Sequence, residues 1–203
     1  MATKQTSRKL PPEILTRAEI LSLMAACGRR SPTGIRNRAL LAVIYRSMLR
    51  ISEALDLHPK DYDPSASTLR VLHGKGDKAR TVGIDADAAA HLERWLEERR
   101  RLSPPRSATL FCTLKGGRVS GSYVRHLLPR LARKAGVEKR VHAHGLRHTG
   151  ASELRSEGVD IGVISKQLGH SSIAVTARYL DHIAPASVIE AITDRPSWTS
   201  SHP

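Results

Sequence analysis

The sequence predicts an α+β fold that is mainly α-helical with a small antiparallel β-sheet. Apolar residues recur at helical spacing over most of the chain, as in ILSLMAAC at 20–27 and in residues 85–101. Residues 68–73 and 79–84 are instead two β-rich runs around GKGD at 74–77, a hairpin signature whose glycines suit a tight turn. With 203 residues, 40% of them hydrophobic, the chain is long enough to bury one core.

Three helices are predicted before the sheet. Thr16 and Glu19 form a capping-box pattern ahead of the first helix. The segment SPTGIRNR at 31–38 predicts a turn into a second helix over 39–47, and a third helix over 51–58 stops at a proline.

The second half of the chain is predicted to be helical around one loop. Residues 103–117 form a loop with at most one short strand. Residues 120–136 have a helical pattern, although Pro129 should kink or interrupt it. Further helices are expected near 144–157, 161–168 and 172–180, with a weaker one near 187–193.

The charge of the chain favours a polyanionic partner. Lys and Arg number 33 against 19 acidic residues, a formal net charge of +14, which favours nucleic acid over an anionic membrane. The alternative is a protein that is basic without a polyanionic partner. Only two cysteines occur, Cys27 and Cys112, and they are interpreted as buried thiols in a reducing compartment. The sequence shows no signal peptide and no apolar run of ~20 residues, so we expect a cytoplasmic, nucleoid-associated protein without membrane contact.

The stretch VHAHGLRHTG at 141–150 concentrates imidazoles around an arginine. On a helix, His144 and Arg147 are one turn apart and share a face. A buried structural histidine beside a surface arginine is the simpler interpretation of this motif alone. A zinc site built on His144 and His148 is disfavoured, because the stretch lacks the glutamate that metal-assisted hydrolysis requires and the guanidinium would repel a dication. We therefore predict no metal and no cofactor.

Five separated motifs together resemble the catalytic domain of the tyrosine recombinase family, which includes phage integrases, Xer-type recombinases and Cre. In chain order they are LRISEAL at 49–55, GKGDKAR at 74–80, HGLRH at 144–148, LGH at 168–170, and Tyr179. The resemblance covers residues 13–182. It implies the tyrosine recombinase catalytic-domain fold and site-specific recombination of DNA.

The resemblance also implies a role for each matching residue. Two arginines would grip the scissile phosphate, a histidine would belong to the HxxR motif, and a second histidine would donate to the phosphate. A hairpin lysine, a buttressing acid and a tyrosine nucleophile complete the set. In the same order these residues are Arg50 and Arg147, His144, His170, Lys75, Glu53 and Tyr179.

The chemistry of these residue types agrees with the implied roles. Cleaving a phosphodiester without a metal needs fixed cations where negative charge develops, and guanidinium groups can bind two oxygens at once. A phenol with a pKa near ~10 needs a base or a cationic pocket, and the imidazole of His144, with a pKa near ~6.5, is the candidate base. Lys75 would protonate the departing 5′-oxygen. The product is a 3′-phosphotyrosine that a 5′-hydroxyl can reverse without ATP.

Other basic residues are candidates for DNA binding. Lys78 and Arg80 are predicted to touch backbone phosphates, with solvated hairpin charges as the alternative. The helix over 120–136 is predicted to lie along a DNA groove, with a solvated basic face as the equal alternative. Its basic residues are Arg125, Arg130, Arg133 and Lys134.

The sequence departs from the family pattern at two places. Met48 stands where many relatives have glycine before LR, so the turn there should be reshaped. Residues 1–12 are expected to be a flexible basic arm with no N-terminal core-binding domain before the catalytic domain. The chain would then be a naturally minimal recombinase, resembling the fimbrial-switch invertases in length, or one from which a domain has been removed.

The expected function is site-specific cleavage and rejoining of double-stranded DNA. The tail at 183–203 holds a candidate helix for docking onto a neighbouring protomer, which implies a homo-oligomer, a tetramer on DNA, with an accessory DNA-bending protein as a further partner. Two alternatives remain: a type IB topoisomerase that relaxes supercoils, and a catalytically silent DNA-binding regulator.

Overall fold

A computed structural model describes residues 13–72 and 79–180 of the chain. The predicted arm at 1–12, hairpin residues 73–78 and the tail after Leu180 lie outside the described residues, as does the helix predicted near 187–193. The helices are α1 (Arg17–Ala26), α2 (Pro32–Arg46), α3 (Ile51–Asp56), α4 (Ala86–Leu102), α5 (Gly121–Ala135), α6 (Ala143–Ser156), α7 (Ile161–Leu168) and α8 (Ile173–Leu180), with a 3-10 turn η1 (Pro59–Asp61). The strands are β1 (Tyr62–Asp63), β2 (Thr68–Val71) and β3 (Arg80–Gly83).

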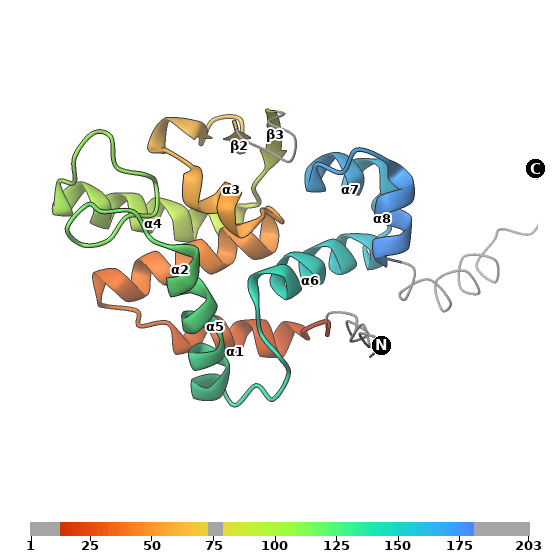
Figure 1. The fold of residues 1–203 in the computed structure, drawn as a ribbon, viewed down its shortest axis with the longest axis horizontal. Helices are drawn as coiled ribbons and strands as arrows, with labels where there is room; N and C mark the ends of the chain where they lie inside the picture. Colours follow the sequence, from red (N-terminus) through yellow and green to blue (C-terminus); the bar gives the residue numbers. More distant parts are fainter. Residues whose placement is uncertain (1–12, 73–78, 181–203) are drawn as a thin grey trace, which may run out of the picture.

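The described elements form one helical assembly around a small sheet, which confirms the predicted fold class. Figure 1 shows α1, α2, α4 and α5 on one side, with α3 packed on α2, and α6, α7 and α8 on the other; α6 packs against α2, and β3 lies beside α7. The strand order is β1-β2-β3 with antiparallel pairing throughout. Residues from both sides therefore meet near α3 and the sheet.

The first two helices begin at side-chain caps. The predicted capping box is present, with Thr16 Oγ1 accepting from the Glu19 amide and a Glu19 carboxylate oxygen accepting from the Thr16 amide. The second helix begins seven residues earlier than predicted, at Pro32 rather than residue 39, so the turn expected at 31–38 was wrong. Ser31 caps it by accepting from the Gly34 amide at 3.2 Å, and Pro32 fits the first helical turn.

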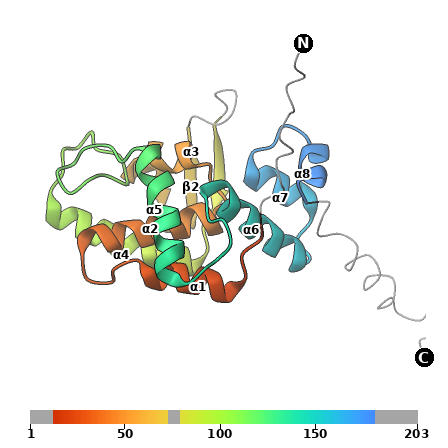
Figure 2. The same cartoon turned by 60° about the horizontal axis from the view of Figure 1, so that its bottom comes forward.

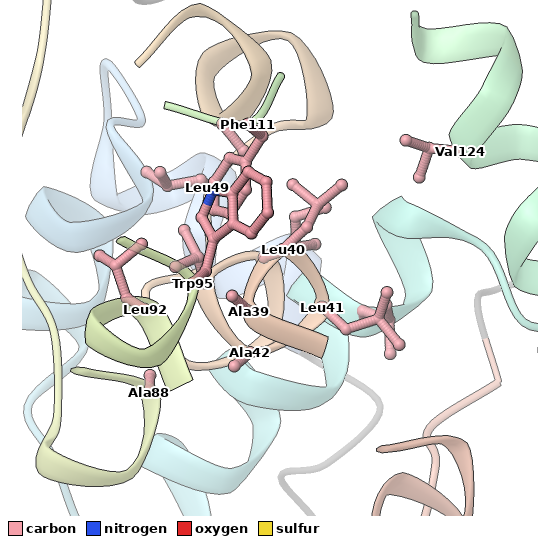
Figure 3. Packing of buried hydrophobic residues seen from close by; sticks show 14 of the residues in the cluster. Ala39, Leu40, Leu41, Ala42, Leu49, Ala88, Leu92, Trp95, Phe111 and Val124 are labelled. Atoms are coloured by element: carbon pink, nitrogen blue, oxygen red, sulfur yellow. The ribbon is translucent and has the colours of Figure 1, made fainter. Parts of the chain in front are cut away.

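The main core lies where α2 packs against α4. Figure 3 shows Trp95 of α4 surrounded by Leu40, Leu49 and Phe111, all buried. The Trp95 indole donates to the Leu110 carbonyl at 2.8 Å, so its polar atom is satisfied inside the core. This contact also holds the loop that follows α4. Within that loop, Cys112 and Arg118 form an isolated antiparallel β-bridge. The core thereby supports the chain on both sides of Arg50.

The sheet has one buried face and one edge against α7. Leu69 pairs with Val82 across β2 and β3, and both side chains are buried. Gln167 of α7 bonds to both backbone groups of Gly83, accepting from its amide and donating to its carbonyl, each at 3.0 Å. β3 and α7 consequently lie side by side in both views (Figures 1 and 2).

Pro129 was predicted to kink or interrupt α5, and the interruption was wrong, because the helix runs through Pro129 without a break. Pro129 lies on the exposed side of the helix. The carbonyl of Arg125 loses its helical donor there, and solvent can replace it on an exposed side. Leu127, Leu128 and Leu131 hold the opposite face of α5 in the core.

A second apolar cluster attaches α6, α7 and α8 to the rest of the fold. It consists of Met48, Ala151, Ile164, Leu168 and Leu180. Gly150 allows α6 to approach α2 closely, because a Cβ atom at that position would lie 2.1 Å from the Tyr45 carbonyl oxygen. In the described part of the chain, no helix is long and apolar enough to span a membrane.

Candidate active site

The HAHGLRH segment begins helix α6, and its first histidine is the helix cap. His142 Nδ1 accepts a hydrogen bond from the Gly145 amide at 2.8 Å. A Cβ atom at position 145 would lie 2.6 Å from that nitrogen, so glycine makes room for the ring. The sequence interpretation assigned no role to His142, although its place three residues before Gly145 at a helix start was the available signal.

Arg147 is a buried guanidinium that joins three motifs. It is 2% exposed; Nη1 donates to the Met48 carbonyl at 2.5 Å and Nη2 to the Leu168 carbonyl at 2.7 Å. Nη2 also lies 3.4 Å from His170 Nε2. Because a buried charge needs bonded partners, these carbonyls fix the guanidinium between the segments that lead to Arg50 and to His170.

Glu53 lies between the two predicted phosphate-binding arginines. Arg50 is the residue immediately before α3. Glu53 is the third residue of that helix, and it is buried. Glu53 Oε1 accepts from Arg50 Nη1 at 2.7 Å, and Oε2 accepts from the Arg50 amide at 2.9 Å. Arg147 Nη1 lies 3.9 Å from Glu53 Oε2. The structure thus brings Arg50, Glu53 and Arg147 together.

The charges of this group are strongly coupled. Burial acts to raise the pKa of Glu53, but hydrogen bonds from Arg80 and Arg50 outweigh it and bring the pKa to about 2. Burial, reinforced by repulsion from Arg50, lowers the pKa of Arg147 to about 10. Both groups are therefore ionised at neutral pH.

The ring of Tyr179 in α8 is enclosed by three imidazoles. Its centroid lies 4.3 Å from that of His148 and 5.6 Å from those of His144 and His170, each in an edge-to-face arrangement. Burial raises the pKa of Tyr179 to about 12, while the charge of Arg147, a hydrogen bond from Arg147 and the charge of Arg50 act in the opposite direction. The imidazole that lies nearest belongs to the buried His148, to which the resemblance assigned no catalytic role.

Tyr179 differs from the other tyrosines in the state of its hydroxyl. The hydroxyls of Tyr45, Tyr62 and Tyr123 bond to Glu153, Glu93 and Asn37 respectively. The Tyr179 hydroxyl is buried and makes no well-aligned hydrogen bond among the described residues, although hydrogen bonding to the nearby Arg147 guanidinium acts to lower its pKa. A buried hydroxyl in this state is uncommon in folded proteins, and a catalytic role or an ordered water is the usual explanation.

The two remaining predicted histidines lie at the same pocket. His144 is exposed, and partial desolvation together with the charges of Arg147, His142 and Arg50 lowers its pKa. His170 Nδ1 lies 2.9 Å from Thr176 Oγ1, while its Nε2 faces Arg147. A guanidinium can only donate, so Nε2 accepts in this arrangement and Nδ1 holds the proton.

Met48 adopts the left-handed conformation that glycine favours. Its φ angle is 52°, a region in which a side chain costs ~1 kcal/mol. The side chain is buried in the same apolar cluster as Leu168 and Ala151, and the Met48 carbonyl accepts a hydrogen bond from Arg147. Packing offsets the backbone cost here.

The predicted hairpin residues divide into two groups. Lys75 and Lys78 lie outside the described residues. Arg80 is described, and the structure places it on Glu53 instead of on the surface, with both terminal nitrogens 2.9 Å from the carboxylate oxygens. Its side chain is 14% exposed.

The basic residues of α5 lie in different surroundings. Arg125, Arg130 and Arg133 are exposed, and Arg125 lines a groove with Ile51 and Ser52, which follow Arg50 directly. Lys134 donates to the Ala26 carbonyl at 3.0 Å, where it satisfies the end of α1. The exposed arginines remain candidates for contact with DNA.

The site combines a phenol, fixed cations and imidazoles close to one another. Its guanidinium groups can bind two oxygens of a phosphate, and its imidazoles can accept or donate a proton. Among residues 13–72 and 79–180, no cluster of three or more His, Cys, Asp or Glu side chains could hold a metal ion. The group of residues is suited to attack on a phosphate by a side-chain oxygen.

Comparison with known proteins places this geometry in a family. The model described as "Phage integrase family" matches residues 13–184. The tyrosine recombinase XerD of Mycobacterium leprae is 35% identical over 202 residues, which cover 95% of this chain and 61% of the relative. The crystal structure of XerA recombinase matches with a TM-score of 0.80 and 30% identity over 94% of this chain and 68% of that one.

A second solved structure adds a nucleic-acid complex. XerH site-specific recombinase bound to palindromic difH substrate, a post-cleavage complex, matches with a TM-score of 0.74 and 28% identity, covering 94% of this chain and 55% of that chain. The chain spans about three-fifths of the length of the XerD relative. Because the family model matches nearly all of the described fold, the chain belongs to the phage integrase family of tyrosine recombinases.

Proposed function

We propose that this chain is the catalytic part of a site-specific DNA recombinase, which cleaves and rejoins double-stranded DNA through Tyr179 without metal or ATP. The observation on which this depends is the buried Tyr179 hydroxyl, which lies beside the Arg147 guanidinium on a ring surrounded by three imidazoles. The pocket around it contains Arg147 and His170, and Glu53 links Arg147 to Arg50.

In the proposed cleavage step, one bond to phosphorus forms as another breaks. The Tyr179 oxygen attacks the phosphorus and forms an O–P bond, and the bond to the sugar 5′-oxygen breaks. The proton of Tyr179 passes to His144, whose lowered pKa keeps the imidazole neutral at neutral pH. Lys75 supplies a proton to the 5′-oxygen, and attack by a 5′-hydroxyl on the phosphotyrosine reverses the step.

Positive charge supplies the transition-state stabilisation. Arg50 and Arg147 would bind the non-bridging oxygens, with His170 donating to the same phosphate. Arg147 is already fixed by two carbonyls, so little reorganisation is needed when charge develops. His170 would have to carry a proton on Nε2 for this donation.

Double-stranded DNA is the proposed substrate. The net charge of +14 and the exposed arginines of α5 support it, as does the DNA-bound XerH structure of the same family. Assembly as a homo-tetramer on DNA through the tail at 183–203, help from an accessory DNA-bending protein and action at the nucleoid are further parts of the proposal.

Trapping on nicked duplexes tests the proposed function. In such substrates the 5′-hydroxyl fragment diffuses away after cleavage, so the protein stays attached to DNA. A pool of duplexes with randomised sequence should yield an adduct that survives denaturation and EDTA and disappears in Tyr179→Phe. Tyr123→Phe, which removes a hydroxyl bonded to Asn37, is the matched control and should retain the adduct.

Two results would contradict this proposal. Specific DNA binding without any adduct would make the chain a DNA-binding regulator. Relaxation of a supercoiled plasmid that contains no paired sites would instead show topoisomerase activity.

A further inference from the structure

Arg80 of β3 forms a two-point ion pair with the acidic residue of the site. Nη1 donates to Glu53 Oε1 and Nη2 to Glu53 Oε2, both at 2.9 Å. Parallel bonds between a guanidinium and a carboxylate are the most directional ion pair available to side chains. The Glu53 side chain is 1% exposed and that of Arg80 is 14% exposed, so solvent screens the pair little.

Arg80 also lies against the turn that leads to His170. Gly169 ends α7 with a φ angle of +65°, and a Cβ atom on it would lie 2.6 Å from Arg80 Nε and 2.7 Å from Arg80 Cζ. Glycine is therefore required at this position for two reasons: the backbone is left-handed, and the guanidinium occupies the space of a side chain.

We propose, on the basis of the recombinase function proposed above, that Arg80 is a positioning residue for DNA cleavage. It occupies both oxygens of Glu53, so that Arg50 and Arg147 stay directed toward the phosphate, and it supports the turn that presents His170. In this role it makes no contact with DNA.

The balance of charge supports this role. Arg50, Arg80 and Arg147 converge on the single carboxylate of Glu53. Arg50 bonds to that carboxylate with one side-chain nitrogen, Nη1, among the described residues, and its side chain is 28% exposed. Without Arg80, both Glu53 oxygens would be open to Arg50, and a guanidinium engaged at two points would be lost to the phosphate.

The fold does not depend on Arg80 alone at this junction. Gln167 separately ties α7 to β3 through Gly83 and to the end of α2 through the Ser47 carbonyl. Leu168 remains in the second apolar cluster. Variants of Arg80 should therefore keep β3 and α7 together while changing the position of Glu53.

The first test compares single-turnover cleavage of a nicked duplex, DNA affinity and thermal melting. Arg80→Ala should cleave ~100-fold more slowly and Arg80→Lys ~10-fold more slowly, with affinity within ~3-fold of wild type, because transition-state contacts are affected more than binding. Arg70→Ala is the matched control: Arg70 lies in neighbouring β2 and pairs with Asp61 at 3.3 Å, with its side chain 54% exposed. Its cleavage rate should be unchanged.

A second substitution separates positioning from simple support of the fold. In the Arg80→Ala background, Glu53→Gln removes the charge that attracts Arg50, so cleavage should recover by ~5-fold or more. If Arg80 only stabilises the fold, the double variant cleaves no faster than Arg80→Ala. That outcome, or wild-type cleavage by Arg80→Ala, overturns the inference.

The same experiments distinguish an error in the proposed recombinase function from an error in the role of Arg80. No adduct with the wild-type chain on any duplex would overturn the recombinase proposal and this inference together. An active wild-type chain with a fully active Arg80→Ala variant overturns the inference alone.

Discussion

Single residues in this pocket fulfil more than one physical requirement. Glu53 caps the start of α3 through the Arg50 amide and compensates the charge of three arginines. Arg147 is at once a buried structural link between Met48 and Leu168 and a candidate phosphate ligand. Stability and chemistry are therefore coupled at the residue scale, and pH should affect both.

Glu53 should make stability depend on pH in the acidic range. Its pKa falls from an ordinary 4.5 to about 2 on folding, which corresponds to about 3 kcal/mol. A lowered folded-state pKa means that this stabilisation is complete above pH 4.5 and disappears as the pH falls toward 2. Urea unfolding should show Glu53→Gln less stable than wild type at pH 7, with a difference that shrinks below pH 4.5. A difference independent of pH would contradict this.

Substitutions of Met48 separate backbone conformation from packing. Met48→Ala and Met48→Gly both remove the buried side chain, but only alanine retains a Cβ at a φ of 52°. Both should be destabilised, with the glycine variant more stable than the alanine variant by ~1 kcal/mol. Chemical denaturation of the pair measures this, and an alanine variant as stable as the glycine variant would show that the turn is unstrained.

At the scale of elements, local signals in the sequence predicted helices better than they predicted contacts between helices. The capping pattern of Thr16 and Glu19 and the β-rich runs that became β2 and β3 are local signals, and both predictions were confirmed. The start of α2 was missed because Gly34 and Asn37 are typical of turns, whereas Gly34 lies in a helix that closely approaches Gly28.

Roles that depend on tertiary contacts were not readable from the sequence. Nothing local shows that Arg80 lies on Glu53, 27 residues away, or that Lys134 ends at the last carbonyl of α1. The motif residues Arg50, Glu53, His144, Arg147, His170 and Tyr179 were predicted as one site, and the structure brings them together. Their catalytic roles and that of Lys75 stay predictions.

The contact between α6 and α2 should be sensitive to one methyl group. Gly150→Ala places a Cβ where the Tyr45 carbonyl oxygen would be 2.1 Å away, so the helices must separate. We expect a loss of about 3 kcal/mol in the free energy of unfolding. Gly158→Ala, at a φ of +82° with nothing within 4 Å, is the control and should cost ~1 kcal/mol. Equal losses in the two variants would mean that α6 can shift freely.

For the whole molecule, the distribution of charge matters more than its sum. The chain has 33 basic and 19 acidic residues, but some of the basic side chains lie inside the fold and not on its surface. Arg147 is buried, and Arg80 is nearly so. Arg125, Arg130 and Arg133 of α5 are exposed, and Arg125 lies beside the start of α3. Electrostatic binding of DNA should depend on these exposed residues.

The salt dependence of DNA binding tests whether the exposed arginines of α5 contact DNA phosphates. Removing one phosphate contact lowers the slope of log affinity against log salt by ~1, so Arg130→Ala should show that change. Arg101→Ala, a similarly exposed arginine at the end of α4, should leave the slope unchanged. Equal slopes for Arg130→Ala and wild type would leave α5 as a solvated basic face.

The most direct test of the account is to locate the atom that holds the DNA in the covalent adduct. Proteolysis of the trapped adduct, nuclease trimming and mass spectrometry of the peptides would identify the modified residue. We predict a nucleotide linked through phosphate to Tyr179 and to none of Tyr45, Tyr62 and Tyr123, whose hydroxyls are already hydrogen-bonded. A nucleotide on any other side chain would contradict it.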